Sequence, residues 1–414
     1  MKKTLWMFAF ALLPLAACCG HIEQQDDGNN PYKPINLSTK QSGFVKSGNA
    51  FACRFLGQID AFAAKDKQDD WFVSPLSLQI ALGMLLNGAQ GETADEICRM
   101  LGYGDGETAE VNVWCKLMLE QLPGLDKKTS LTLANAIFYN KDISLKGPFK
   151  ERVNNAYGAT LEALDFSKVK ASAGTINDWC KKQTEGMIPE VLDGVDPRAL
   201  AYLINALYFK SEWARKFPKS DTANETFTRE DGSSTKVKMM KLAGKNFDYR
   251  ENDLYQSVQL PYGNGAFAMS VLLPKKDHTV AEIAAALGKD GFSAGGISAE
   301  VDLWLPRFET KYHITLNEVL QAMGMTRSFI PGAADFFAMC DRASYVDFVQ
   351  QDAAVKVDEE GTEAAAVTVI AMEFTSSGTT PRKVVFHADR PFLYLITETS
   401  TGAILFAGKY AGKQ

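Results

Sequence analysis

The chain has 414 residues, of which 46% are hydrophobic and 23% charged, the composition of a globular protein with an ample core. Its net charge is −6 with acidic and basic residues interspersed, which argues against a nucleic-acid-binding protein. The length fits one large domain or two or three small ones.

The N-terminus reads as an export signal over residues 1–17. Two lysines precede an apolar run over residues 5–17, which is too short to span a membrane. The run ends in the letters LAAC, which resemble a bacterial lipobox. That resemblance implies that Cys18 is lipidated and becomes the mature N-terminus, followed by a flexible polar tether to residue 42. The alternative is an ordinary signal peptide that happens to contain a cysteine.

Hydrophobic periodicity predicts mainly helices in the first half of the chain and mainly strands in the second. The predicted helices cover residues 49–64, 76–87, 92–101, 111–121, 171–184, 280–287 and 316–323. The predicted strands cover residues 131–139, 200–209, 237–242, 255–261, 266–273, 300–306, 384–386, 393–397 and 404–410. No repeat or linker divides residues 43–414, so we predict a single α+β domain there.

The sequence offers no constellation of catalytic residues. It holds four histidines and neither an HExxH helix motif nor a G-x-S-x-G elbow. We therefore expect no enzymatic activity, no metal site and no cofactor. Beyond Cys18 and Cys19, five cysteines lack any CxxC spacing and most lie in apolar or helical contexts, which predicts buried free thiols; they are Cys53, Cys98, Cys115, Cys180 and Cys340.

Residues 359–386, EEGTEAAAVTVIAMEFTSSGTTPRKVVF, combine three patterns in one segment. The segment opens with acidic residues and small apolar ones and continues with a β-branched run. It then becomes rich in Ser, Thr, Gly and Pro before a strand. A core strand would not continue into such a loop, and a helix would disfavour the β-branched run.

Six stretches, in order, resemble the serpins, a superfamily of protease inhibitors. They are FVSPLS (72–77), NDWCKKQTEGMIPEVL (177–192), NALYFK (205–210) with Trp213, EEGTEAAA (359–366), FHADRPFLYLI (386–396) and FAGK (406–409). The resemblance covers roughly residues 43–412. It implies the serpin fold, with three β-sheets, eight or nine helices and an exposed reactive-centre loop at about residues 359–385. It also implies that a protease which cuts this loop is trapped as an acyl-enzyme when the loop inserts into the central sheet.

The hinge of the loop meets the demands of such insertion. By the resemblance it consists of Glu359, Glu360, Gly361, Thr362, Glu363, Ala364, Ala365 and Ala366. Side chains of a strand alternate between two faces, so the inward row would be Thr362, Ala364, Ala366, Thr368, Ile370 and Met372. The first four are small and uncharged, and Gly361 supplies backbone freedom. Glu363 falls on the solvent side, where its charge remains hydrated.

The resemblance assigns further residues to the opening of the sheet. Ser74, Ser77 and Asn205 match a polar cluster under the central sheet, and Trp213 matches the tryptophan at the point where the loop enters. Many serpins have a histidine where this chain has Gln351, so we expect any pH sensitivity at that position to be absent. Ser211, two residues before the tryptophan, replaces a common glycine.

The same resemblance places the reactive bond seventeen residues into the loop. Counting from Glu359 gives Thr375–Ser376, and alternatives are the bonds after Phe374 and after Met372. Thr375 suits elastase-like or subtilisin-like proteases and Phe374 suits chymotrypsin-like ones, while apolar residues before the bond also suit papain-like cysteine proteases. Arg382 and Lys383 resemble a trypsin site but lie too far along the loop to trap a protease.

The sequence thus predicts a monomeric inhibitor that forms covalent complexes with serine, and also cysteine, proteases. We expect it to be exported and either lipid-anchored through Cys18 at an outer membrane or cell surface or secreted. The alternative is a non-inhibitory serpin that acts as a carrier or chaperone, in which bulky or charged residues typically occupy the inward hinge positions.

Overall fold

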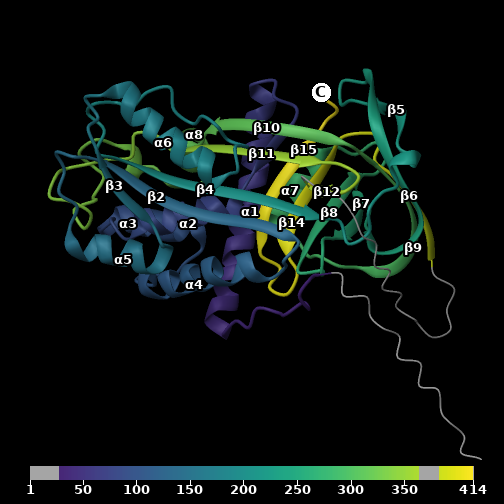
Figure 1. Ribbon diagram of the computed structural model, residues 1–414, viewed down its shortest axis with the longest axis horizontal. Coiled ribbons are helices and arrows are strands. Elements are labelled where there is room, and N and C mark those ends of the chain that lie inside the picture. The colour runs from purple at the N-terminus through teal and green to yellow at the C-terminus, as the bar shows by residue number, and fades with distance from the viewer. Residues whose placement is uncertain (1–27, 363–381, 414) are drawn as a thin grey trace, which may run out of the picture.

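The computed structural model describes residues 28–362 and 382–413 (Figure 1). The α-helices of this part are α1 (Thr39–Lys65), α2 (Pro75–Leu86), α3 (Gly91–Leu101), α4 (Thr108–Gln121), α5 (Gly147–Tyr157), α6 (Val169–Gln183), α7 (Val280–Asp290) and α8 (Asn317–Ala322). Short 3-10 helices are η1 (Leu122–Gly124), η2 (Lys219–Asp221) and η3 (Arg327–Phe329). The strands are β1 (Trp71–Val73), β2 (Thr129–Asn140), β3 (Thr160–Leu164), β4 (Ala201–Glu212), β5 (Ala223–Thr228), β6 (Ser234–Glu251), β7 (Tyr255–Pro261), β8 (Phe267–Pro274), β9 (Ile297–Pro306), β10 (Phe308–Thr315), β11 (Gln350–Val357), β12 (Gly361–Thr362), β13 (Arg382–His387), β14 (Phe392–Glu398) and β15 (Ile404–Tyr410).

The described strands form two hydrogen-bonded sheets. The six-stranded sheet has the order β10-β11-β12-β4-β2-β3, and the nine-stranded sheet has the order β1-β15-β14-β8-β7-β6-β9-β13 with β5 paired to β6. A serpin is expected to have three sheets. Here the two smaller sheets are continuous through the 18-residue β6, so the described strands form two hydrogen-bonded sheets. The end of β6 pairs with β7 and its middle with β9, with a bulge between Leu242 and Lys245.

Helices α1 and α2 owe their boundaries to clear local signals. Ser38 caps α1 in a capping box with Gln41, and apolar residues then recur on one face of the helix. Ser74 caps α2 by accepting a hydrogen bond from the Ser77 N–H, and Pro75 occupies the first turn. Because almost every residue of α2 is buried, this helix lies inside the molecule rather than on its surface.

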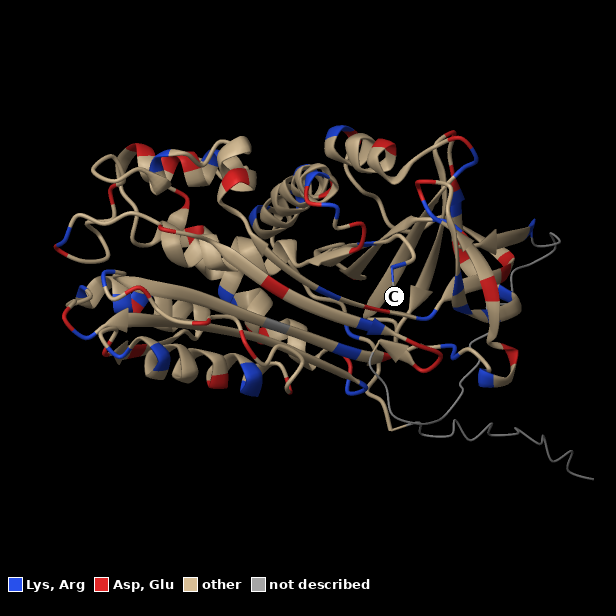
Figure 2. Cartoon of the chain, turned by 90° about the horizontal axis from the view of Figure 1, so that it is seen from above, with Lys and Arg blue, Asp and Glu red and all other residues tan. Residues whose placement is uncertain are grey.

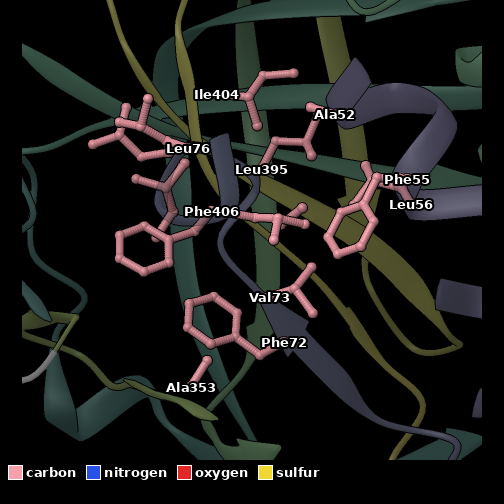
Figure 3. Close-up of a cluster of buried hydrophobic side chains, with 14 of the residues drawn as sticks. Ala52, Phe55, Leu56, Phe72, Val73, Leu76, Ala353, Leu395, Ile404 and Phe406 are labelled. Carbon is pink, nitrogen blue, oxygen red and sulfur yellow. The ribbon is translucent and has the colours of Figure 1, made fainter. Parts of the chain in front are cut away.

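The main core lies between α1, α2 and the nine-stranded sheet (Figure 3). The rings of Phe72 on β1 and Phe406 on β15 are stacked with centroids 5.2 Å apart, and Phe72 also stacks on Tyr394 of β14. Ala353 brings β11 of the six-stranded sheet to the same cluster, so the core links the two sheets.

A second, smaller core covers the opposite face of the six-stranded sheet. Phe138 of β2 packs edge-on against Trp179 of α6 at 5.9 Å, and Tyr202 of β4 joins the same cluster. Its neighbour Ile137 belongs instead to the main core, as the alternation of strand side chains requires. Helix α6 therefore packs on one face of this sheet and α2 on the other (Figure 1).

The domain begins earlier than residue 43. Helix α1 starts at Thr39, and residues 28–38 lie against the body instead of forming part of a flexible tether. The Asn30 side chain donates to Leu125 O at 2.9 Å and accepts from the Lys127 N–H at 2.7 Å, and the Ile35 N–H donates to Ser400 Oγ. Ile35 is itself buried in the main core. Specific side-chain contacts thus order a segment whose composition is polar.

The remaining general expectations concern cysteines, charge and membrane spans. All five cysteines of the described residues are buried and free, as the sequence predicted. Basic and acidic residues are interspersed along the chain, as the blue and red segments of the cartoon in Figure 2 show. Among the helices in the described ranges, none combines the length and apolar character needed to cross a membrane. The same ranges contain no group of residues suited to hold a metal ion.

Candidate functional site

The residues predicted to start the hinge form a short strand inside the six-stranded sheet. β12 lies between β11 and β4 and is antiparallel to both, with Thr362 opposite Val357 on one side and Ser211 on the other. Just before it, Glu360 O accepts a hydrogen bond from the Trp213 N–H at 2.8 Å. The chain therefore enters the sheet at one end of β4.

Gly361 is placed where no side chain fits. A Cβ atom on this residue would lie 2.1 Å from Ser211 O and 2.7 Å from Glu212 Cα. Both are backbone atoms of β4 and cannot rotate away. From the sequence, the role predicted for Gly361 was backbone flexibility. The structure adds a second role: only glycine lets the backbones of β12 and β4 approach this closely.

Thr362 points into the core beneath the sheet. It is 1% exposed, and its Oγ1 lies 2.7 Å from the hydroxyl of Tyr262, where either group could donate. The Tyr262 ring stacks on Trp213 with centroids 4.4 Å apart, and Trp213 Nε1 donates to Asp358 O. Burial raises the pKa of the Tyr262 phenol, so this hydroxyl stays protonated.

Two cations hold Glu360 at the hinge. Its carboxylate lies 2.9 Å from both Lys216 Nζ and Lys219 Nζ, and Lys216 also pairs with Glu212 of β4. Hydrogen bonds from Lys216 and Lys219 lower the pKa of Glu360. Burial disfavours the charge of Lys216, yet its two carboxylate partners outweigh this and raise its pKa. Glu360, Lys216 and Lys219 are therefore ionised at neutral pH.

Glu359 is anchored separately. It is 5% exposed, accepts a hydrogen bond from Thr222 Oγ1 at 2.8 Å and lies 3.8 Å from Arg307 Nη1. The Phe217 N–H also donates to its carbonyl. Both acidic residues at the hinge are thus fixed to the segment that follows β4 and to the β9–β10 connection.

The four residues expected in the polar cluster come together at the start of α2. Both ends of the Gln351 amide bond the backbone of Ser74, with Oε1 accepting from N–H at 2.9 Å and Nε2 donating to O at 3.0 Å. Ser77 Oγ donates to Asn205 Oδ1, and Asn205 Nδ2 donates to Asn135 Oδ1. The N-terminus of α2 therefore contacts both β11 and β4. Sequence reasoning missed Asn135 because its role depends on β2 lying next to β4.

Beyond β12, the space between β4 and β11 holds a cavity, which we call the slot. Its volume is about 470 Å³, and its walls include residues 201–206 of β4 and residues 350–352 of β11. Leu78 and Leu82 of α2 line it from the core side, whereas Ile188 and Leu192, which follow α6, line it from the outer side. In the described residues no ladder joins β4 directly to β11.

Other predicted site residues lie outside the described residues. These are Cys18, Glu363, Ala364, Ala365, Ala366, Met372, Phe374, Thr375 and Ser376. The strand that follows the loop is described: β13 pairs in parallel with β9.

Residues 46–412 match the sequence profile of the family described as "Serpin (serine protease inhibitor)". The chain belongs to the serpin family. This serpin is 31% identical to plasminogen activator inhibitor 1 of Neovison vison, over 87% of this chain and 90% of that protein. Serpins are in general protease inhibitors rather than enzymes, and proteases are their partners.

Solved structures confirm the fold. Tengpin, a thermophilic serpin in its native state, superposes with a TM-score of 0.79 at 29% identity, covering 93% of this chain and 97% of tengpin. Thyroxine-binding globulin in complex with thyroxine superposes with a TM-score of 0.75 at 25% identity, covering 90% and 99% of the two chains. The fold therefore also occurs in a protein that binds a small molecule.

Proposed function

We propose that this serpin is a suicide-substrate inhibitor of elastase-, subtilisin- or chymotrypsin-like serine endopeptidases, with papain-like cysteine proteases as further targets. The protease nucleophile attacks the loop, forms an acyl-enzyme and releases the amine of the next residue. The freed loop then enters the slot as a strand between β11 and β4 and carries the protease with it. Inhibition follows because the trapped acyl-enzyme no longer completes hydrolysis.

The register of β12 is the observation that carries this proposal. Thr362 pairs with Ser211 and Val357, so a strand that continued in the same register would bring Thr368 opposite Asn205 and Gln351. It would bring Met372 opposite Ala201, the first residue of β4. The small and β-branched segment 361–372 is therefore as long as β4, at about 3.3 Å per residue or roughly 40 Å.

The reactive bond is proposed as Thr375–Ser376, with the bonds after Phe374 and Met372 as alternatives. A bond three residues beyond the inserted segment would leave the acylated protease at the far end of the slot. Thr375 favours pockets for small side chains, and Phe374 favours a chymotrypsin-like pocket.

The deciding experiment mixes the protein with elastase, subtilisin, chymotrypsin and papain in turn. We expect SDS-resistant complexes with at least one serine protease, and mass spectrometry of the released C-terminal fragment identifies the bond. Clean cleavage by every protease without any complex would refute inhibition.

Trypsin is the negative control in the same experiment, because we expect it not to be trapped. Arg382 starts β13, bonds Glu251 and lies over the Tyr249 ring at 5.4 Å, so it is part of a sheet instead of an open loop. We expect trypsin to inactivate the inhibitor without being trapped. A stable trypsin complex joined at Arg382 would contradict the proposed bond.

A carrier or chaperone role is the second candidate, and the similarity to thyroxine-binding globulin is the observation in its favour. The small residues at the inward hinge positions favour the inhibitor instead, because a carrier has no need of an insertable loop. Binding of a hydrophobic ligand together with failure to form any protease complex would reverse this preference.

We further propose that the protein is exported and anchored by a lipid on Cys18. The LAAC motif supports this, and the letters of residues 18–27 are mostly polar. A Cys18→Ala variant should lose incorporation of radiolabelled palmitate and move from the membrane fraction to the soluble fraction. Unchanged membrane association of that variant would overturn the anchor.

A further inference from the structure

The outer side of the slot is covered by residues 188–192, which we call the roof segment. Ile188, Val191 and Leu192 line the cavity from this side. Asn177 of α6 fixes the segment: its Oδ1 accepts from the N–H groups of Val191 and Leu192 at 2.9 and 3.0 Å. Its Nδ2 donates to Leu192 O at 2.8 Å. The roof segment therefore moves together with α6.

Helix α6 is attached mainly to the β2–β4 side of the slot. Its apolar face packs on Phe138 and Tyr202, which belong to β2 and β4. Tyr208 of β4 donates to Glu185, which follows α6, at 3.2 Å. The roof thus extends from β4 over the slot toward β11.

A side-chain hydrogen bond joins the roof to the opposite edge of the slot. Gln350, the first residue of β11, donates from Nε2 to Val191 O at 2.8 Å. The same nitrogen lies 2.6 Å from Asp352 Oδ2, and Asp352 in turn lies 2.7 Å from His313 Nδ1 on β10. The amide is thus oriented by β11 itself and directed at the roof.

We propose that Gln350 is a positioning residue whose bond to Val191 holds the roof segment down and limits the rate at which the loop fills the slot. This inference rests on the proposed function. A strand continuing from β12 would pass beneath Ile188 and Leu192, whose side chains now line the space that it must occupy. The roof has to lift for insertion to finish, and the Gln350 bond opposes that movement.

The test uses the full chain with Gln350→Met, which removes both N–H donors at similar side-chain length. We expect the uncleaved protein to convert to an inactive, loop-inserted form about three to ten times faster, as the loss of one hydrogen bond predicts. Conversion is followed without protease, by native gels and by thermal unfolding of samples taken during incubation. Gln68→Met, at an exposed glutamine, is the matched control.

A second variant and a second readout separate this role from general destabilisation. Gln350→Glu should accelerate conversion more than Gln350→Met at neutral pH, because a carboxylate would face Val191 O and Asp352. The thermal stability of the cleaved form should stay unchanged in Gln350→Met, whereas a merely structural role would lower it too.

The outcomes distinguish the two proposals. Conversion rates equal to wild type in both variants would overturn the role of Gln350, even if wild type forms protease complexes. Absence of complexes with wild type would overturn the proposed function, and the protease-free rates would still decide the role of Gln350.

Discussion

At the scale of single residues, the backbone of β4 leaves no room for a side chain at Gly361. Because a Cβ atom would meet the β4 backbone at 2.1 Å, Gly361→Val should expel β12 from the sheet. We expect slower insertion, so that most of the protein is cleaved without trapping, and the stoichiometry of inhibition against elastase should rise several-fold. Gly43→Ala is the control, since nothing lies within 4 Å of its Cβ position. An unchanged stoichiometry would mean that β12 plays no part in insertion.

Glu360 makes the hinge sensitive to acid. Its pKa is lowered from 4.5 by Lys216 and Lys219. A carboxyl group with a lowered pKa in the folded protein stabilises the fold above its ordinary pKa, and this contribution is lost as the pH falls through the lowered value. Glu360→Gln should therefore reduce the free energy of unfolding of the uncleaved protein by about 1–2 kcal/mol at neutral pH.

Urea unfolding measures this difference, which should vanish well below the ordinary glutamate pKa. Glu309→Gln is the control, because its ion pair with Lys311 is exposed and should contribute little. A Glu360→Gln difference that persists unchanged in acid would contradict the ionic explanation.

Asp70 has the opposite pH dependence. Burial raises the pKa of its carboxyl from 3.8 to about 6, although the Ala411 N–H donates to it. The folded protein binds a proton more tightly here than the unfolded chain, so stability falls as the pH rises from about 4 to about 6 and stays reduced above. Asp70→Asn keeps the carbonyl acceptor and should add about 1–3 kcal/mol at pH 7. Thermal unfolding across this pH range, with Asp69→Asn as control, tests the prediction; an equal gain at pH 4 would contradict it.

At the scale of elements, insertion requires that the inward-facing side chains of the loop can be buried beneath the sheet. Thr362 is buried beside Tyr262, and a cation there would lose its hydration without gaining a partner. Thr362→Arg should turn the inhibitor into a substrate that is cleaved at the same bond but forms no SDS-resistant complex. Glu363→Arg, on the outward row, should still trap the protease. If Thr362→Arg traps the protease as well as wild type does, the assignment of residue 362 to the inward-facing row of the inserted strand is wrong.

The elements themselves were predictable to differing degrees. Strands β7 and β15 match their predicted ranges, since the alternating pattern of β7 and the apolar run of β15 both end at clear turn residues. Helix α5 was not predicted because it begins with Gly-Pro, although its buried residues Phe149, Val153 and Tyr157 recur at helical spacing. Strand β10 was overlooked although its residues alternate strictly between buried and exposed.

The site could be predicted where it follows local sequence and not where it depends on long-range pairing. The hinge and the four-residue cluster were predicted from their motifs, and their described residues lie in the six-stranded sheet and at the start of α2. Lys216, Tyr262, Asn135 and Gln350 were not, because each acquires its partner only when strands distant in sequence become neighbours. The spacing of residues along the chain does not predict which distant strands will pair, and so it does not predict those contacts.

At the scale of the whole molecule, the six-stranded sheet is divided. One half, β10 and β11, and the other half, β4, β2 and β3, are joined through the two residues of β12 in the described part of the chain. The start of α2 bonds both halves through Gln351 and Asn205. If the loop adds one further strand to this sheet, as we propose, the uncleaved protein is a kinetically stable state above a lower free-energy minimum.

Cleavage of the loop should therefore raise the thermal stability of the whole domain. A strand over residues 361–372 would add ladders to both β4 and β11. The ten further residues would form about 15–20 new hydrogen bonds with the two neighbouring strands, and at roughly 1 kcal/mol each these correspond to an increase in melting temperature on the order of 20 °C. Differential scanning calorimetry before and after limited elastase digestion measures it, and cleaved Thr362→Arg, which cannot bury the first inward residue, should gain much less. Equal melting temperatures of the intact and cleaved wild-type protein would show that the slot does not accept the loop.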